Sequence, residues 1–415
     1  MSNSQAWRAF KHRNYRLLYP ASAMSNIGTW AQRVAQDWLV LELTGSAQIL
    51  GIVTGLQFAP TLFLSLWAGS LADKFDKRKL LYITNIGAGV VSAWLGVLIV
   101  LGVVEIWHVY VAALAVGIFS ALDAPVRTSF TSELVGKNDL PNAVSLNSAN
   151  FNIGRLIGPA MSGFLIFFFG TGPSFLINSF SYVVMIVTLT MINADELHTQ
   201  KGAELGTKIM DALRYIRSRL DLTLVMLTVF FSATFGLNYQ IFNALMATQE
   251  FKMGPAEFGS LGTFLAVGSL SGALIAARLE SWRVPRRIMA GAVIFGITLV
   301  LLSVAPNYLV YSIMLPFGGA IALMSLVSAN SYVQTSVDPN LRGRIMGVYV
   351  LIFMGGTPIG SPMIGFLAGE IGIRATIAVC GTLTALAALI LFLIFTVKRD
   401  AIGAAKAGSM PRSKR

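Results

Sequence analysis

Four charged side chains stand inside otherwise apolar stretches of this chain: Arg33, Asp37, Asp123 and Arg155. A charge in such surroundings is costly and persists mainly where it is paired or faces water. A carboxylate there can exchange a proton within the physiological pH range. Asp37 is therefore our preferred proton-coupling residue, with Arg33 or Arg155 as its switching partner and Asp123 as the reserve proton site.

Two stripes of polar and aromatic residues recur at helical spacing, one in each half of the chain, and each would line a cavity. The first is Asn26, Trp30, Arg33 and Asp37, and the second, which carries no charge, is Ser232, Gly236, Tyr239 and Asn243. The predicted substrate-cavity residues are Asn26, Trp30, Arg33, Asn147, Arg155, Tyr239 and Asn243.

The charges of this cavity favour neutral or anionic compounds over cations, because Arg33 and Arg155 outnumber Asp37 once Asp123 is assigned elsewhere. A second interpretation of the same residues stays open. Arg33 and Asp37 are one helical turn apart, so they could form a permanent ion pair that only stabilises the outer half of their helix.

Composition indicates that these stripes belong to membrane-spanning helices. The chain is 55% hydrophobic and 12% charged, with a mean hydropathy of +0.69, whereas soluble domains carry about 25% charged residues. Apolar stretches long enough to cross a bilayer recur along almost the whole length. We predict twelve spans, near residues 16–41, 47–72, 79–102, 107–130, 141–169, 172–193, 222–249, 257–281, 286–305, 308–333, 344–369 and 373–397.

Lysine and arginine placement predicts the orientation, because cationic loops stay on the cytoplasmic side. Most of the 31 Lys and Arg residues lie in the termini or in even-to-odd connections, so both termini are expected in the cytoplasm. The anionic inner leaflet accounts for the net charge of +12 without a nucleic-acid partner. No cleavable signal peptide is recognised, and the plain sequence suits a bacterial cytoplasmic membrane.

The two halves repeat one theme. An offset of about 202 residues brings Gly154, Gly158 and Gly163 onto Gly356, Gly360 and Gly365, and such small residues let helices approach closely in lipid. We therefore predict an N-terminal six-helix bundle (1–193), a cytoplasmic amphipathic linker (194–221), a C-terminal six-helix bundle (222–397) and a basic tail (398–415). The linker helix would present Leu205, Ile209, Leu213, Ile216 and Leu220 on one face.

The turn after the second span carries a further pattern. Gly69, Asp73, Lys74, Lys77 and Arg78 follow the loop signature Gly-x-x-x-Asp-Arg/Lys-x-Gly-Arg-Arg/Lys, with Asp76 in place of the second glycine. Through this signature the chain resembles the major facilitator superfamily over roughly residues 8–398. The resemblance implies an all-α membrane fold of twelve helices in two pseudo-symmetric six-helix bundles.

The resemblance also implies a cytoplasmic gate made of Gly69, Asp73, Lys74, Arg78 and Asp123. Asp73 would face the N-terminus of the eleventh span, near Arg344, where exposed N–H groups attract a carboxylate. Lys74 and Arg78 would reach Asp123 or Glu133. The competing interpretation is a solvated cationic loop.

Export is favoured by a second motif. Gly154, Gly158, Pro159 and Gly163 are similar to the fifth-helix signature of the superfamily's antiporters, with Ser162 replacing one glycine. The segments 25–30, 121–127 and 147–163 resemble the subgroup that contains the enterobactin exporter and macrolide-efflux proteins.

We therefore predict a proton-coupled antiporter that exports amphipathic, drug- or siderophore-like organic compounds by rocker-switch alternating access. The alternatives are a proton-coupled importer and a non-transporting receptor or lipid-handling scaffold. An enzyme is not expected: the three histidines are scattered, and no ATP-binding loop or metal-ligand cluster occurs. The expected partners are a small organic substrate, protons and membrane lipids, with a proton gradient in place of a cofactor and a monomeric protein.

Overall fold

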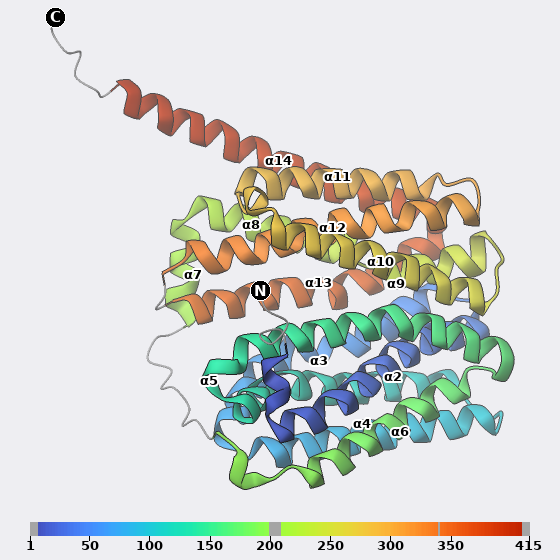
Figure 1. Cartoon of the computed structure of the whole chain (residues 1–415). Helices are drawn as coiled ribbons and strands as arrows, with labels where there is room; N and C mark the ends of the chain where they lie inside the picture. Colours follow the sequence, from blue (N-terminus) through green and yellow to red (C-terminus); the bar gives the residue numbers. More distant parts are fainter. Residues whose placement is uncertain (1–6, 199–208, 339–340, 409–415) are drawn as a thin grey trace, which may run out of the picture.

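The computed structural model describes residues 7–198, 209–338 and 341–408, and every regular element in these ranges is helical. The all-α fold class predicted from the sequence is confirmed. Figure 1 shows long helices running side by side in two groups, with the early helices in one group and the late helices in the other.

The first group, which we call the N-terminal bundle, follows a short 3-10 turn, Arg8–Lys11. Its helices are α2 (Arg13–Thr44), α3 (Ala47–Lys74), α4 (Lys77–Val100), α5 (Ile106–Phe169) and α6 (Gly172–Met191). Helix α5 contains both the fourth and the fifth predicted span. The chain reverses at Gly136, whose φ of 68° lies in the left-handed region that glycine adopts without strain.

The C-terminal bundle begins after α7 (Ile209–Ser218). Its first span is interrupted, running through α8 (Leu220–Phe231), the π-helical turn η3 (Ser232–Gly236), α9 (Tyr239–Leu245) and the π-helical turn η4 (Met246–Glu250). The remaining spans are α10 (Pro255–Arg278), α11 (Pro285–Ser303), α12 (Tyr308–Ser336), α13 (Arg342–Ile371) and α14 (Ile373–Gly408). Short 3-10 turns, η2 (Ala194–Glu196) and η5 (Glu280–Trp282), lie in connections.

Ten segments in the described part of the chain are long and apolar enough to span a membrane. Helix α5 counts once among them although it crosses twice, and α2 is not among them because it carries many buried polar residues, including Gln32, Gln36 and Asp37. If α5 is counted as two spans and α2 is added, the ten segments become the twelve predicted spans. Two of these side chains on α2 bond to neighbouring helices: Gln32 accepts a hydrogen bond from Asn178, and Gln36 donates one to Gln57.

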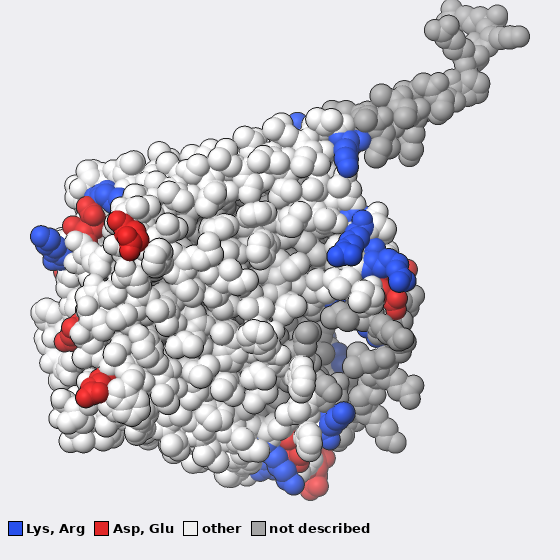
Figure 2. Space-filling view, turned by 180° about the vertical axis from the view of Figure 1, so that it is seen from behind, with Lys and Arg blue, Asp and Glu red and all other residues white. Residues whose placement is uncertain are grey.

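Charged side chains gather at the two ends of the molecule, and the face in Figure 2 shows a broad band without them between those ends. Where α2 begins and α14 ends, the charged side chains are mainly basic, as at Lys77–Lys79 and Arg286–Arg287. We call this the basic end. The other end carries Glu42, Glu105, Glu250, Glu257 and Glu370 with Lys252 and Arg374.

The repeated glycines make equivalent contacts in the two bundles. A Cβ at Gly158 would lie 2.5 Å from Cβ of Trp30 on α2, and a Cβ at Gly360 would lie 1.9 Å from the carbonyl oxygen of Thr234 in η3. Each glycine thus packs its helix against the first span of its own bundle. Only glycine permits this separation of the backbones.

The third glycine of each copy packs across the bundles instead. A Cβ at Gly163 would lie 2.8 Å from the carbonyl oxygen of Pro255 on α10, and a Cβ at Gly365 would lie 2.5 Å from that of Ala47 on α3. The two junctions, α5 with α10 and α3 with α13, are therefore related by the same repeat that the sequence carries.

Helix α7 is amphipathic, as predicted, and packs on α8 and α13. Its buried residues are Ala212 and Ile216, whereas Leu213, predicted on the same apolar face as Ile216, is 36% exposed. Leu205 lies outside the described residues.

Candidate functional site

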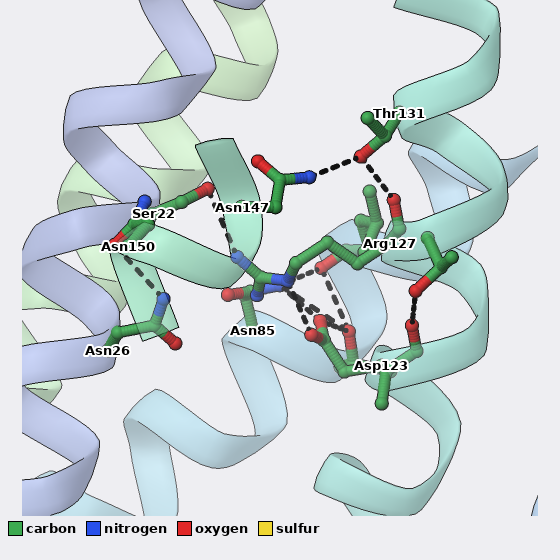
Figure 3. A network of polar contacts seen from close by, with 12 residues as sticks. Ser22, Asn26, Asn85, Asp123, Arg127, Thr131, Asn147 and Asn150 are labelled. Atoms are coloured by element: carbon green, nitrogen blue, oxygen red, sulfur yellow. Dashed lines mark hydrogen bonds and ion pairs between the residues drawn. The ribbon is translucent and has the colours of Figure 1, made fainter. Parts of the chain in front are cut away.

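A cavity of about 320 Å³ lies within the N-terminal bundle. Helices α2, α4, α5 and α6 supply its walls, and polar side chains meet there from α2, α4 and both spans of α5 (Figure 3). The lining includes four of the seven predicted substrate-cavity residues: Asn26, Trp30, Arg33 and Asn147. Its size is typical of a small-molecule site.

Asp123 and Arg127 form the charged centre of one wall (Figure 3). Arg127 Nε lies 2.7 Å from Asp123 Oδ2, while Asp123 Oδ1 accepts hydrogen bonds from Thr84 at 2.9 Å and from Asn85 at 3.0 Å. Both carboxylate oxygens are therefore occupied. This geometry favours a role for Asp123 in holding Arg127 rather than in exchanging protons.

Uncharged amides and hydroxyls continue this network. Asn147 donates to the hydroxyl of Thr131 at 3.2 Å and accepts from that of Tyr15 at 3.0 Å, and Asn26 donates to Asn150 at 3.2 Å. Amide groups both donate and accept hydrogen bonds, so this wall can bind oxygen- and nitrogen-bearing substituents of a ligand.

Arg33 lines the cavity but makes no ion pair or hydrogen bond with any described residue. Its guanidinium carbon lies 4.9 Å from the ring centroid of Trp30 and 5.3 Å from that of Phe58 on α3. The two aromatic rings hold the cation by cation–π attraction. The permanent Arg33–Asp37 ion pair, weighed as an alternative above, is not formed.

Asp37 lies outside the cavity, at the junction of the two bundles. Its side chain is buried, and Oδ2 accepts a hydrogen bond of 2.5 Å from Nε2 of Gln240, at the start of α9. Oδ1 is buried without any partner among the described residues. The carboxyl group that we expected to couple protons thus touches the opposite bundle.

Three predicted cavity residues do not line this cavity. Arg155 extends to α10, where its Nη2 donates to Ser269 Oγ at 3.1 Å. Tyr239 and Asn243 are buried within the C-terminal bundle, where Asn243 accepts a hydrogen bond of 3.0 Å from Tyr311. The side chains of Tyr239 and Asn243 therefore face the core of the C-terminal bundle rather than this cavity.

The predicted gate contacts also differ in the structure. Lys77, rather than Lys74 or Arg78, reaches Glu133, at 2.7 Å, while Arg78 donates to the carbonyl oxygen of Thr190 at 3.1 Å and Lys74 is exposed. Lys77 lies at the first position of α4, on the side of the turn that faces α5. Gly69 and Asp73 lie outside the residues whose side chains are described.

Asp76, which departs from the superfamily loop signature, caps α4. Its Oδ1 accepts the backbone N–H groups of Arg78 at 2.8 Å and of Lys79 at 3.1 Å. Aspartate is a preferred residue at a helix N-cap. The departure therefore stabilises the start of α4, and its charge is engaged locally.

A second ionic cluster joins the N-terminal turn to the connection within α5. Asp139 contacts His12 Nε2 at 3.0 Å and Arg8 Nε at 3.2 Å. The hydrogen bond from His12, with the charge of Arg8, lowers the pKa of the Asp139 carboxyl group. These contacts fix the start of α2 beside the reversal at Gly136.

Arg127, Lys77 and Gln240 were not identified as site residues from the sequence. The four-residue spacing of Asp123 and Arg127 on one helix could have indicated their pairing. Lys77 stood in the loop signature without an assigned contact. Gln240 carried no signal, because only the packing of the bundles brings it to Asp37.

Comparison with known proteins identifies the family. The model of the transmembrane secretion effectors, a family of the major facilitator superfamily, matches residues 4–413. The chain belongs to this family. It is therefore a secondary transporter and not an enzyme, and the predicted superfamily is confirmed.

Related transporters support this membership over most of their length. The transporter is 25% identical to the staphyloferrin A transporter of Staphylococcus aureus over 91% of this chain and 95% of the relative. It is 24% identical to the multidrug efflux pump Tap of Mycolicibacterium fortuitum (87% and 90%) and 22% identical to the enterobactin exporter EntS of Salmonella typhi (89% and 85%).

Solved structures share the fold of this transporter. A bacterial homologue of the lysosomal transporter Spinster, in an inward-facing and unoccupied conformation, gives a TM-score of 0.75 at 14% identity, covering 95% of this chain and 97% of that one. A D-xylose–proton symporter gives 0.70 at 16% identity, covering 90% and 96%.

Proposed function

We propose that this transporter is a proton-coupled antiporter that exports amphipathic organic compounds across a bacterial cytoplasmic membrane by rocker-switch alternating access. Both termini lie in the cytoplasm in this proposal, because cationic segments are retained on that side. The basic end is then the cytoplasmic end. The relatives named for multidrug efflux and for siderophore export support this direction and substrate range.

The distribution of the hydrophobic core supports the alternating-access part of the proposal. At the end opposite the basic one, a single cluster of buried side chains joins both bundles, from Val34 and Leu39 to Tyr239 and Phe258. At the basic end, the described side chains form a separate core in each bundle. A transporter closed outside and open toward the cytoplasm requires this asymmetry.

Contacts across the bundles follow the same asymmetry. Trp38 stacks on Phe258 with ring centroids 6.2 Å apart, and Gln249 donates to the carbonyl oxygen of Gly45 at 3.1 Å, both near the outer end. Near the basic end, a Cβ at Gly343 or Gly347 of α13 would meet no described atom within 4 Å. A substrate could therefore enter from the cytoplasm.

Asp37 is the proton-coupling residue in this proposal. When the outer end is closed, its buried carboxyl group has one oxygen without a partner, and the described cation nearest along the helix, Arg33, makes no ion pair with it. Burying an unpaired charge is costly, so closure favours the protonated form. Opening the outer end would separate Asp37 from Gln240 and admit water, which favours ionisation.

The test uses proteoliposomes that contain a pH-sensitive dye and a panel of lipophilic drugs and siderophore-like anions. We expect substrate-dependent proton movement with the wild type. With Asp37→Asn we expect no more proton movement than in empty liposomes, because asparagine keeps an oxygen that can accept the hydrogen bond from Gln240 but cannot exchange a proton. Proton flux that remains in Asp37→Asn would show that another residue carries the proton. Uptake of substrate driven by an inward proton gradient would favour import, and the absence of flux with every compound would refute the transport proposal.

A further inference from the structure

The cavity of the N-terminal bundle contains one cation whose hydrogen-bond donors are unused. Of the three arginines in the interior, Arg127 is paired with Asp123 and Arg155 donates to Ser269, whereas Arg33 contacts only aromatic rings among the described residues. Its Nε is buried without a partner. Such a group is an exception to the rule that buried donors are satisfied, and it calls for an explanation.

A ligand anion would supply the missing partner. The guanidinium group is planar and presents paired N–H donors that match a carboxylate in a bidentate arrangement. Trp30 and Phe58 hold its position without using those donors. Because Asp123 already neutralises Arg127, the charge of Arg33 is the uncompensated charge of the lining.

The surroundings of Arg33 define the rest of the ligand. Trp30 and Phe151 meet edge to face with centroids 5.7 Å apart on one side of the cavity, and Phe119 and Tyr19 also line it. These rings offer an apolar surface for a flat or aromatic group, while Asn26 and Asn150 offer amides on the adjoining wall.

We propose that Arg33 is the docking point for a carboxylate, so that the transporter's substrates are amphipathic organic anions with an aromatic or similarly flat apolar body. This inference deepens the proposed function and rests on it for the direction of transport. Binding itself, however, can be measured without transport.

The experiment compares naphthalene-2-carboxylate with naphthalene-2-carboxamide, which has the same apolar body and no charge. Equilibrium binding of each is measured at pH 7 on purified full-length protein in nanodiscs, with empty nanodiscs subtracted. We expect the wild type to bind the carboxylate about tenfold more tightly than the amide, as a charge-assisted bidentate contact implies. Arg33→Gln should bring the ratio of the two affinities to about one. Arg33→Lys keeps the charge but loses the paired N–H donors of the guanidinium group, so it should give an intermediate ratio.

Arg286→Gln is the matched control, because Arg286 also lies over an aromatic ring, Phe392, at 5.6 Å but outside the cavity. It should leave the ratio unchanged. Thermal unfolding of each variant shows whether it is folded. If Arg33→Gln does not fold, the ratio measured with Arg33→Lys decides the test. Equal affinity of the wild type for both compounds, or an unchanged ratio in Arg33→Gln, would overturn the inference. A carboxylate preference without proton flux would instead leave the anion site standing and refute antiport.

Discussion

Asp37 on α2 and Gln240 on α9 are 203 positions apart in the chain, yet Gln240 Nε2 donates to Asp37 Oδ2 at 2.5 Å. The bond crosses the junction of the two bundles at the closed end. It joins the residue expected to exchange protons to the surface that must separate when the transporter opens outward. In the proposed cycle, this contact would link protonation of Asp37 to closure of the outer end.

Loss of this contact should weaken closure of the outer end. Gln240→Leu removes a hydrogen bond worth about 0.5–1.5 kcal/mol, so the outward-open population should rise roughly two- to tenfold. Spin labels at Phe169→Cys and Met253→Cys, on a Cys380→Ser background, would report the separation of α5 and α10. The conservative change Gln240→Asn serves as the control for polarity. A distance distribution identical to that of the wild type would show that the bond does not contribute to closure.

The Asp123–Arg127 pair should stabilise the N-terminal bundle through a specific coupling. Asp123→Asn and Arg127→Gln should each lower the free energy of unfolding by about 1.5–3 kcal/mol, and the double variant should lose less than their sum. A double-mutant cycle by thermal unfolding measures this coupling.

The exposed pair Arg214–Asp211, at 3.8 Å, is the comparison for that cycle. Its coupling should stay below about 0.5 kcal/mol, because water screens surface pairs. Additive losses at Asp123 and Arg127 would mean that the two side chains act independently, against the observed geometry.

Lys77 and Lys74 should differ in their contribution to stability. Lys77→Gln leaves Glu133, whose side chain is 9% exposed, without its cation, which should cost about 1–3 kcal/mol. Lys74→Gln alters an exposed side chain and should change stability by less than about 0.5 kcal/mol. Unfolding temperatures in one detergent give the comparison. A larger loss of stability with Lys74→Gln than with Lys77→Gln would support the predicted contact of Lys74 with Asp123 or Glu133.

The close approach of the bundles at Gly163 should not tolerate a methyl group. Gly163→Ala places Cβ 2.8 Å from the carbonyl oxygen of Pro255, so α5 and α10 must move apart, at a cost of about 1–3 kcal/mol. Transport should fall, and the distance between labels at Phe169→Cys and Met253→Cys should increase.

Gly347→Ala makes the same change at a position where no atom of the described residues lies within 4 Å. It should leave transport unchanged and raise stability by up to about 1 kcal/mol, since alanine is the better helix former. Similar losses in the two variants would indicate that the effect at Gly163 is not one of packing between the bundles.

The sequence by itself determined the class of the protein, its spans and its internal repeat. Apolar stretches of bilayer length and regularly spaced glycines are local properties, because each span satisfies its own backbone hydrogen bonds in lipid and needs no partner to be recognised. The same local pattern identified Arg33 and Asp37 as exceptional charges and placed Asn26 and Trp30 on one helical face with them.

Only the tertiary structure decided what those side chains meet. Helical spacing shows which residues share a face but not which way the face turns, so Tyr239 and Asn243 were assigned to a cavity although they are buried in the core. Likewise, the hydrogen bond between Gln240 and Asp37 and the contact of Arg33 with the ring of Phe58 each join two separate helices. The rotation of each helix is fixed by packing against its neighbours, which no single span encodes.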